Sequence, residues 1–366
     1  MGSLMQAGRL AMAQGRRTLL GWGSAYPDEA ISTQDLCAHI EHRFDIPTQR
    51  FAKFLAGKLG VQTRHLCRDF VQAQESPRAG ARNPELAARA MQQALHQAQL
   101  PADDLAYLIS HTTTPAQLLP AGSAEISRLV GHTGAHMELR QACTGFANAL
   151  QIAFAMTAHP DAAPVGIVGV ETGSVYFDPN SLRERTAQWV NFLQMGDGAA
   201  AVVIGPDTGG RDGSNSPMIH SAYFGQAQQP PKPGLRLAVG GSDNTYTHAG
   251  TAQFEHDFDS VMQEGLALLQ YGRDVLASQG HGLHDAAWVV PHQASGALAP
   301  WLARRWDLPP ERVSAHGARV GNLGSASIWA ALDDVLQQRT QWAGQSALFL
   351  GAEATQYSYG GFVCNL

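Results

Sequence analysis

The chain has 366 residues, of which 44% are hydrophobic and 15% charged, and its formal net charge is -6. This length is ample for two domains or one duplicated domain, and an acidic balance without a basic stripe argues against a nucleic-acid partner. No apolar run approaches the ~20 residues that a membrane helix needs. The low charged fraction indicates that surface is buried in a homodimer.

The four cysteines are scattered, and no CxxC pair occurs among them. This pattern argues against a disulfide scaffold or a zinc ribbon and favours reduced thiols in the cytoplasm. The N-terminus lacks a secretory pattern because its basic residues follow its apolar ones. We therefore expect a cytoplasmic protein with no metal and no permanently bound cofactor.

Apolar, strand-like runs alternate with helical patterns after an N-terminal extension at residues 1–16. Asn83 and Pro84 are expected to provide the N-cap and first-turn proline of one helix. The helix at 145–157 is apolar all round, so we expect it to be buried. In the first half, 17–205, the patterns predict strands at 18–21, 105–110, 137–139, 165–170 and 199–204 and helices at 83–100, 121–130 and 145–157.

Residues 206–217 are rich in Gly, Asp and Ser and are typical of a linker. The second half, 218–366, repeats the order of strand, reactive residue, buried helix and further strands, which suggests an internal duplication. The alternation predicts an α/β protein whose helices cover a largely parallel sheet. The expected elements are helices at 254–278, 295–306 and 322–338 and strands at 286–290, 346–350 and 360–364.

A candidate nucleophile, Cys143, lies among small residues where a predicted strand meets a predicted helix. The N–H groups and dipole of a helix N-terminus stabilise a thiolate, so this position favours a nucleophilic thiol near neutral pH. A lone cysteine is otherwise most often a buried structural residue. We interpret the other three in that way: Cys37, Cys67 and Cys364.

Two further motifs follow in chain order. His292 leaves the end of an apolar strand after Pro291 and precedes a helix, and strand carboxyl ends are where open α/β sheets bind ligands. Asn322 is the second residue of the segment GNLGSAS and is expected to open a helix. By itself this segment indicates a capped helix. Asp197, in a Met-Gly-Asp-Gly turn, is interpreted as structural, and so is Glu171, with an active-site carboxylate as the alternative.

Together these motifs resemble those of β-ketoacyl-[acyl-carrier-protein] synthase III and its relatives, whose ACAGF-, PHQAN- and GNTSAAS-like segments carry a Cys-His-Asn triad. Their counterparts here are QACTGF at 141–146, PHQAS at 291–295 and GNLGSAS at 321–327. The likeness extends from about Leu20 to Leu366 and includes the segments at 111–115, 171–172 and 195–200. It implies a thiolase-like fold of two duplicated halves in αβαβα layers.

The resemblance also implies a two-stage reaction. Cys143 is acylated by a thioester of coenzyme A or acyl carrier protein, and a malonyl- or β-ketoacyl-type thioester then condenses with it decarboxylatively. Backbone N–H groups of Cys143 and of the turn at Ala354 and Thr355 would hold the oxyanion. His292 and Asn322 would donate hydrogen bonds to the developing enolate, and neutral donors suit this task because they do not stabilise the carboxylate ground state.

Several positions depart from the family pattern. Phe54 and Lys58 lie where an aromatic residue and an arginine clasp the coenzyme A nucleotide, and Lys lacks the planar fork of Arg. Ser295 ends the PHQA motif in place of Asn, and Ala297 replaces an arginine that docks the carrier protein. Leu119 belongs to a segment that would reach across a homodimer to cap the partner's acyl tunnel.

Ala354-Thr355-Gln356 stands where the family has a glycine-rich turn. We expect from these departures a specialised enzyme of secondary metabolism. The nearest alternative keeps the triad but passes the acyl group to an alcohol or amine. Others are a non-catalytic partner subunit of a heterodimeric synthase, disfavoured by the intact triad, and a cysteine hydrolase, disfavoured by the PHQA and GN segments.

Overall fold

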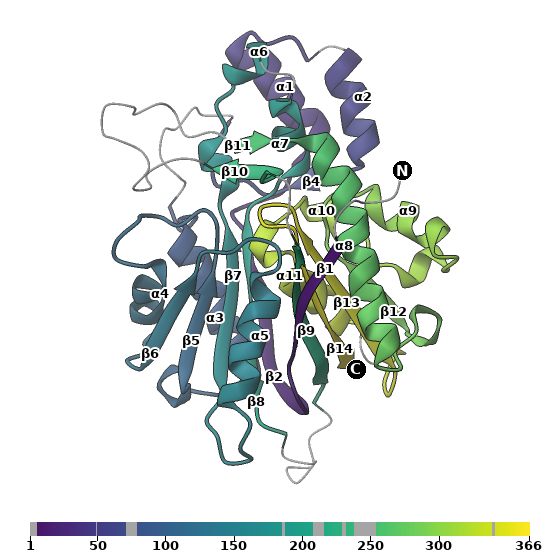
Figure 1. Cartoon of the computed structure of the whole chain (residues 1–366). Coiled ribbons are helices and arrows are strands. Elements are labelled where there is room, and N and C mark those ends of the chain that lie inside the picture. The colour runs from purple at the N-terminus through teal and green to yellow at the C-terminus, as the bar shows by residue number, and fades with distance from the viewer. Residues whose placement is uncertain are drawn as a thin grey trace.

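The structure is a computed structural model of the whole chain (Figure 1). It describes residues 6–48, 50–70, 79–184, 187–207, 216–228, 232–237, 254–338 and 341–366. Most of the predicted linker at 206–217 lies outside these described residues. The elements of the first half are β1 (Gln6–Met12), β2 (Arg16–Ala25), β3 (Ile31–Ser32), α1 (Thr33–Phe44), α2 (Arg50–Leu59), β4 (Thr63–Arg64), α3 (Asn83–Ala98), β5 (Tyr107–His111), α4 (Gly122–Val130), β6 (Ala135–Leu139), α5 (Gly145–Met156), β7 (Val165–Glu171), α6 (Ser181–Glu184), α7 (Gln188–Gln194) and β8 (Gly198–Gly205).

The second half contributes a further series of helices and strands, among which α8 is the long helix at the right of Figure 1. These elements are β9 (Met218–Gln228), β10 (Leu235–Leu237), β11 (Phe254–His256), α8 (Phe258–Ser278), β12 (Trp288–Pro291), α9 (Leu298–Arg305), α10 (Gly317–Val320), α11 (Ser327–Leu336), β13 (Ser346–Glu353) and β14 (Ser358–Asn365).

Two sets of strands share one order. Along the sheet, β5-β7-β8-β2 and β12-β13-β14-β9 each begin with a parallel pair and continue with two antiparallel pairs. The sets join where Arg16–Thr18 of β2 pairs with Met218–His220 of β9. The shared order confirms the expected duplication, whereas the expectation of a largely parallel sheet is wrong. A short turn such as 354–357 joins only antiparallel neighbours, because parallel ones need a long crossover.

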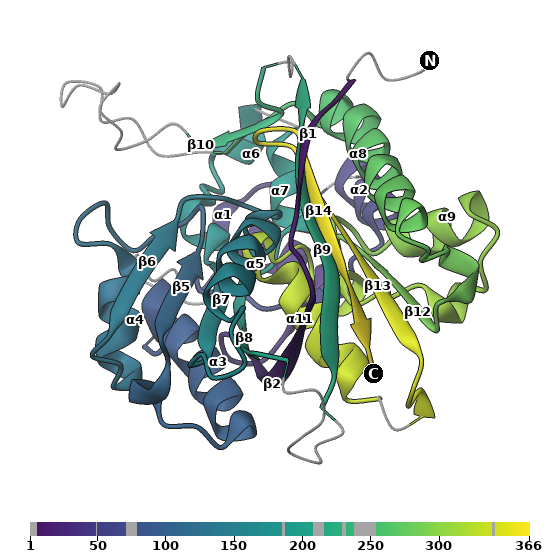
Figure 2. The ribbon, with the colours of Figure 1, turned by 60° about the horizontal axis from the view of Figure 1, so that its bottom comes forward.

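The helices form three layers around these strands, as Figures 1 and 2 show. α3 packs on the outer face of β7 and β8, and α8 and α9 pack on the outer face of β13 and β14. Between the two sets lie α5 and α11, whose side chains share one core with both. Phe146 of α5 meets Trp329 of α11 edge-on, with ring centroids 5.7 Å apart. The chain therefore buries α5, as its all-round apolar sequence predicted.

Several local expectations differ from the structure. The N-cap before α3 is Arg82, and Asn83 is the first residue of the helix. The buried amide of Asn83 does not cap the helix but donates to Thr112 Oγ1 and to the carbonyl of Thr114. Phe254 belongs to β11 and not to the helix that follows. Part of the N-terminal extension, Gln6–Met12, pairs antiparallel with β9.

Within the part of the chain that the structure describes, no helix combines the length and the apolar character needed to cross a bilayer. The same residues contain no group of three or more His, Cys, Asp or Glu side chains placed to hold a metal ion.

Candidate active site

Cys143 lies in the turn between β6 and α5, two residues before the helix begins, and is half-buried. The turn sits close over the end of β5 because Gly145 has no side chain. A Cβ at that position would lie 2.6 Å from Nδ1 of the buried His111, so only glycine fits here. The sequence thus brings Cys143 to the amino end of the central helix, as predicted.

A buried carboxylate, Glu353 at the end of β13, lies against this helix start. It is 1% exposed, and its Oε2 accepts from the backbone N and the Oγ1 of Thr144, at 2.9 Å and 2.6 Å. Thr355 donates its hydroxyl to the other oxygen. Glu353 therefore already accepts from the backbone N–H of Thr144, next to Cys143. An anion bound at the helix N-terminus would otherwise use this N–H group.

Glu171, at the end of β7, is a second buried carboxylate of this site. Thr113 N donates to it at 2.9 Å and Thr114 Oγ1 at 2.6 Å, and Ser325 Oγ donates at 2.5 Å. Burial raises the pKa of Glu171 above its usual range. The Glu171 carboxylate therefore connects residues 112–115 to the segment that follows Asn322. This position agrees with the interpretation of Glu171 as a structural residue.

These surroundings correct the prediction of a preformed thiolate. Burial raises the pKa of the Cys143 thiol well above its ordinary value, and the negative charges of Glu353 and Glu171 add to that effect. The helix N-terminus lowers a thiol pKa only where no anion already neutralises its field. Burial, with the charges of Glu353 and Glu171 added, therefore favours the thiol form of Cys143.

His292 directly follows β12 and is 5% exposed. Its backbone N donates to the carbonyl of Leu350 at 2.7 Å, which fixes it beside β13. Burial lowers the pKa of the imidazole to about 4, so the ring is neutral at pH 7. The buried Nδ1 has no hydrogen-bond partner among the described residues, which is costly in a folded protein unless a ligand supplies one.

Asn322 is half-buried at the start of a 3-10 turn that leads into α11. Its Oδ1 accepts from the backbone N of Gly324 at 3.0 Å and from Ser327 Oγ at 3.3 Å. These two donors fix which end of the amide is oxygen. The Nδ2 group therefore points away from them with both of its donor hydrogens available.

Shared partners bring the three predicted segments together. Ser325 Oγ contacts the carbonyl of Gln141 at 3.1 Å, which links the Asn322 segment to the turn of Cys143. Gln194 accepts from the backbone N of Asn322 at 2.8 Å, and its side chain donates to the carbonyl of Ala294, two residues beyond His292. The Cys, His and Asn segments thus converge, as their order in the sequence suggested.

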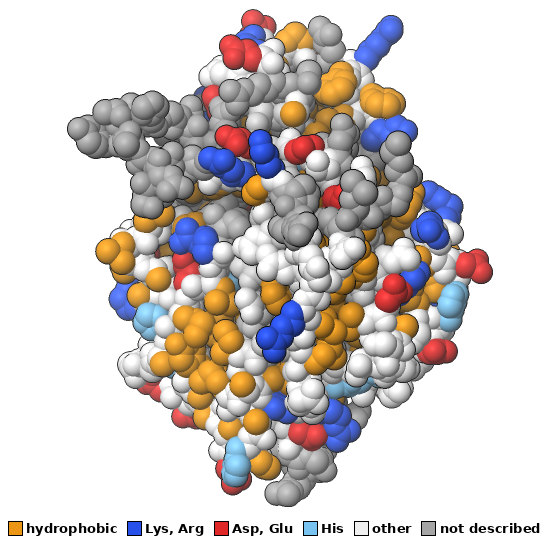
Figure 3. All heavy atoms as spheres, viewed as in Figure 1, with side chains coloured by type: hydrophobic (Ala, Val, Ile, Leu, Met, Phe, Trp, Pro, Cys, Tyr) orange, Lys and Arg blue, Asp and Glu red, His pale blue; other side chains and the backbone are white. Residues whose placement is uncertain are grey.

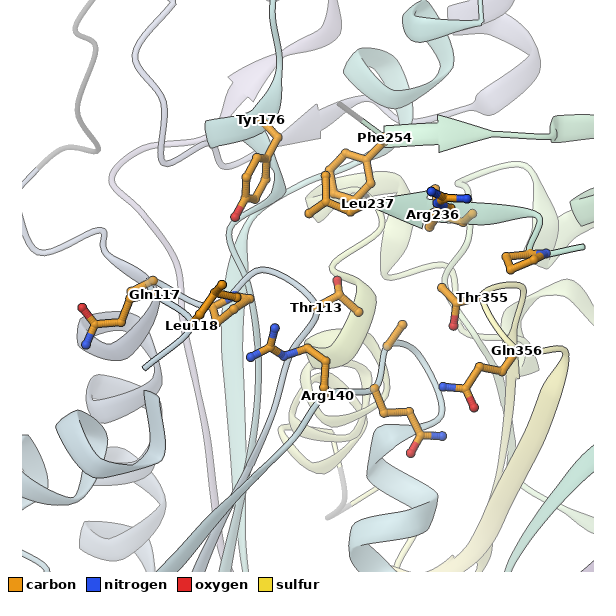
Figure 4. A pocket seen from close by; sticks show the side chains of 16 residues that line it. Thr113, Gln117, Leu118, Arg140, Tyr176, Arg236, Leu237, Phe254, Thr355 and Gln356 are labelled. Atoms are coloured by element: carbon orange, nitrogen blue, oxygen red, sulfur yellow. The ribbon is translucent and has the colours of Figure 1, made fainter. Parts of the chain in front are cut away.

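A cleft of about 430 Å³ opens beside the turn of Cys143 (Figure 4). Its walls are largely apolar and aromatic but include threonine and glutamine side chains, and two arginines are the only charged side chains among the described lining residues. Of the predicted site residues, only Thr355 is in the lining. The lining residues are Thr113, Pro115, Ala116, Gln117, Leu118, Arg140, Gln141, Ala142, Tyr176, Pro233, Leu235, Arg236, Leu237, Phe254, Thr355 and Gln356.

The remaining predicted binding residues lie elsewhere. Phe54 is 62% exposed on α2, and the Lys58 ammonium lies 5.4 Å from the centre of its ring. Ser295 is half-buried next to Gly296, which packs against the end of α2. Leu119 is 86% exposed.

Sequence reasoning missed Glu353 and Arg140. The signal for Glu353 was an acidic residue at the end of an otherwise apolar strand, FLGAE, which a buried strand rarely carries without a partner. Asp197, by contrast, has the structural role that was predicted. It is buried and accepts from the backbone N of Cys67 at 2.7 Å and of Ser174 at 3.1 Å.

Several known proteins have sequences similar to this chain. The family models described as 3-oxoacyl-[acyl-carrier-protein (ACP)] synthase III and its C-terminal region match residues 137–222 and 276–366. The β-ketoacyl-[acyl-carrier-protein] synthase III of Xanthomonas oryzae pv. oryzae is 27% identical over 344 residues, 90% of this chain and 92% of that protein.

Two solved structures have the same fold. The 3-oxoacyl-(acyl carrier protein) synthase III of Pseudomonas aeruginosa PAO1 is 25% identical with a TM-score of 0.77, over 96% of this chain and 98% of that one. The tetronic acid condensing enzyme AbyA1 superimposes with a TM-score of 0.80 at 21% identity, over 96% and 100%. The expected thiolase fold is thereby confirmed. This chain is a condensing enzyme similar over most of its length to β-ketoacyl-[acyl-carrier-protein] synthase III, whose fold it shares.

Proposed function

We propose that the enzyme acylates Cys143 from a thioester and condenses this acyl group with the enolate formed when a malonyl-type thioester loses carbon dioxide. The observation that carries the proposal is the pair of neutral donors on converging segments. Oδ1 of Asn322 is held by Gly324 and Ser327, which leaves its NH2 group available. His292 is uncharged at neutral pH and its buried Nδ1 has no partner among the described residues.

In the first stage, the Cys143 sulfur attacks the thioester carbonyl carbon and the bond to the carrier sulfur breaks. The proton of Cys143 ends on the departing carrier thiolate. Backbone N–H groups of Cys143 and of the turn at Ala354 and Thr355 would hold the oxyanion of the tetrahedral intermediate. The turn lies beside the cleft next to Cys143, since Thr355 is in its lining.

In the second stage, the malonyl-type thioester loses carbon dioxide, and the electron pair of the broken bond moves into an enolate. Amide and imidazole donors from Asn322 and His292 stabilise the enolate oxygen without favouring the carboxylate that precedes it. The enolate carbon then attacks the acyl carbonyl and the bond to the Cys143 sulfur breaks. The Cys143 thiolate takes a proton from solvent, and the β-ketoacyl product leaves with its carrier.

Thioesters of coenzyme A, of acyl carrier protein or of both would be the substrates. The adjacent side chains of Phe54 and Lys58 are suited to a coenzyme A nucleotide, through stacking and charge. Ser295, near the end of α2, would face the same carrier. The departures at Lys58, Ala297 and Ala354 support a specialised substrate.

A homodimer is part of this proposal. Hydrophobic side chains gather over β5, β6 and α5 on the face shown in Figure 3, and Leu118 and Leu119 are 58% and 86% exposed. An exposed apolar surface of this kind is typical of a protein interface. Light scattering coupled to size exclusion should give the mass of two chains, and a monomer would contradict this part.

The test separates the two stages in one variant. Asn322→Ala should still be acylated, as measured by the mass of the intact protein, but should release carbon dioxide from a malonyl thioester ~10²–10³-fold more slowly, the usual effect of losing one such donor. Asn180→Ala, an exposed control on another segment, should match the wild type, and Cys143→Ser should not be acylated. Equal loss of both stages in Asn322→Ala would contradict the assigned role.

One observation favours a second function. A buried carboxylate, Glu353, contacts Thr144 next to the nucleophile, where it could accept a proton from an alcohol or amine that attacks the acyl group. The product would then be an ester or amide, and no carbon dioxide would be released. Acyl transfer to such an acceptor without carbon dioxide release would favour this function over condensation.

A further inference from the structure

The cleft beside Cys143 combines apolar and aromatic walls with threonine and glutamine side chains and two guanidinium groups. Tyr176, Phe254 and three leucines form much of its wall. Arg140 and Arg236 are the charged side chains among its described lining residues, none of which is acidic. A lining of this kind suits a ligand that has an apolar stem and a polar or charged group at one end.

Arg140 is held so that most of its donors remain available. One of its terminal nitrogens donates to Glu138 Oε1 at 2.9 Å. The other oxygen of Glu138 accepts from the backbone N of Gly122 at 2.8 Å. Glu138 therefore binds the guanidinium through one oxygen and not in a bidentate pair. Arg140 keeps 47% of its side chain exposed and, in Figure 4, extends into the cleft below Tyr176.

The remaining N–H groups of Arg140 form the planar fork that matches a carboxylate. Arg140 is three residues before Cys143, and Gln141 and Ala142, which also line the cleft, lie between them. Three residues span at most about 11 Å of extended chain, so a short acyl group on Cys143 can reach the guanidinium. None of the lining residues comes from α2, where Phe54 and Lys58 lie, so the cleft is separate from the expected carrier site.

We propose that the acyl group loaded on Cys143 carries a carboxylate at its far end, which Arg140 binds. The inference rests on the proposed acylation of Cys143 and names the substrate class for that step. The loading reaction is the same thioester exchange: the Cys143 sulfur bonds to the acyl carbon, the bond to the coenzyme A sulfur breaks, and the thiol proton of Cys143 passes to coenzyme A.

The test compares acyl groups that differ only in this carboxylate. Purified full-length enzyme is mixed with coenzyme A thioesters in matched pairs: butanoyl and succinyl, hexanoyl and adipoyl, octanoyl and suberoyl. Rates of Cys143 acylation are followed by the mass of the intact protein. In at least one pair, the dicarboxylic member should load at least about tenfold faster, the effect expected from one charge-assisted hydrogen bond.

Variants assign the preference to Arg140. Arg140→Gln should bring the ratio within a pair close to one, and Arg140→Lys should keep part of it, because a single ammonium replaces the fork. Arg128→Gln, an exposed arginine on α4, should keep the wild-type ratio. If Arg140→Gln does not fold, the reduced ratio expected for Arg140→Lys tests the assignment, and an unchanged ratio in that variant would overturn it.

Three results would overturn the inference. Equal loading within every pair by the wild type would refute it while leaving the proposed function intact. An equal loss for both members of a pair in Arg140→Gln would mean that Arg140 binds the carrier phosphate, which all the thioesters share. No acylation of Cys143 by any thioester would refute the proposed function and this inference with it.

Discussion

Replacing Glu353 with Gln should make Cys143 more reactive in the resting enzyme. The substitution keeps the size of the side chain and an oxygen that can accept from the backbone N of Thr144, now 2.9 Å from Oε2. It removes a negative charge that raises the pKa of the Cys143 thiol. The pKa of Cys143 should therefore fall, and a larger thiolate fraction should be present at neutral pH.

The size of the change follows from the contact. Since Thr144 directly follows Cys143, the carboxylate lies on the order of 6 Å from the sulfur. Two unit charges at this separation interact by roughly 3 kcal/mol at an effective dielectric constant of ~20, which corresponds to a roughly 100-fold change in the thiolate fraction at neutral pH. We expect the thiolate fraction to rise roughly 10- to 100-fold, with the thiol form still favoured because burial and Glu171 continue to raise the pKa.

The assay is the rate of alkylation by iodoacetamide as a function of pH, with the modified residue identified by peptide mass mapping. The other three cysteines are buried, so Cys143 should be modified first. Glu125→Gln, on the distant helix α4, serves as the control and should keep the wild-type profile. An unchanged or higher pKa of Cys143 in Glu353→Gln would refute the electrostatic reasoning.

Three further predictions concern pH and packing. Burial lowers the pKa of His111 to about 3, below its unfolded value, so its contribution to stability is complete above pH ~6.5 and falls as the pH drops. This loss should reach about 3 kcal/mol at pH 4, and urea titrations should show a smaller loss between pH 7 and pH 4 in His111→Gln. The neutral imidazole of His292 predicts no ionisation near pH 6.5 in carbon dioxide release by acylated enzyme, and a limb centred there would contradict its role. Gly21→Ala should destabilise the protein by about 1–3 kcal/mol, because its Cβ would lie 2.0 Å from a carbonyl of α3, whereas Gly57→Ala, with open space around it, should be neutral or stabilising in the same thermal unfolding assay.

The sequence by itself determined the nature of the protein. Cys143 and His292 each follow the end of a predicted strand and precede a helical pattern, and Asn322 begins another helical pattern; such local patterns depend on near neighbours in the chain. The duplication was readable from the order of elements. The mixed direction of the strands was not, because it depends on how β13, β14 and β9 pair through space.

The tertiary structure alone decided the electrostatics of the site. Burial raises the pKa of the Cys143 thiol, and Glu353, which contacts Thr144 across 209 positions of sequence, adds to that effect. Arg140 extends into the cleft while one oxygen of Glu138 accepts from its guanidinium and the other accepts from the backbone N of Gly122. The pKa of a group and the exposure of a charge depend on distances through space, which no spacing along the chain specifies.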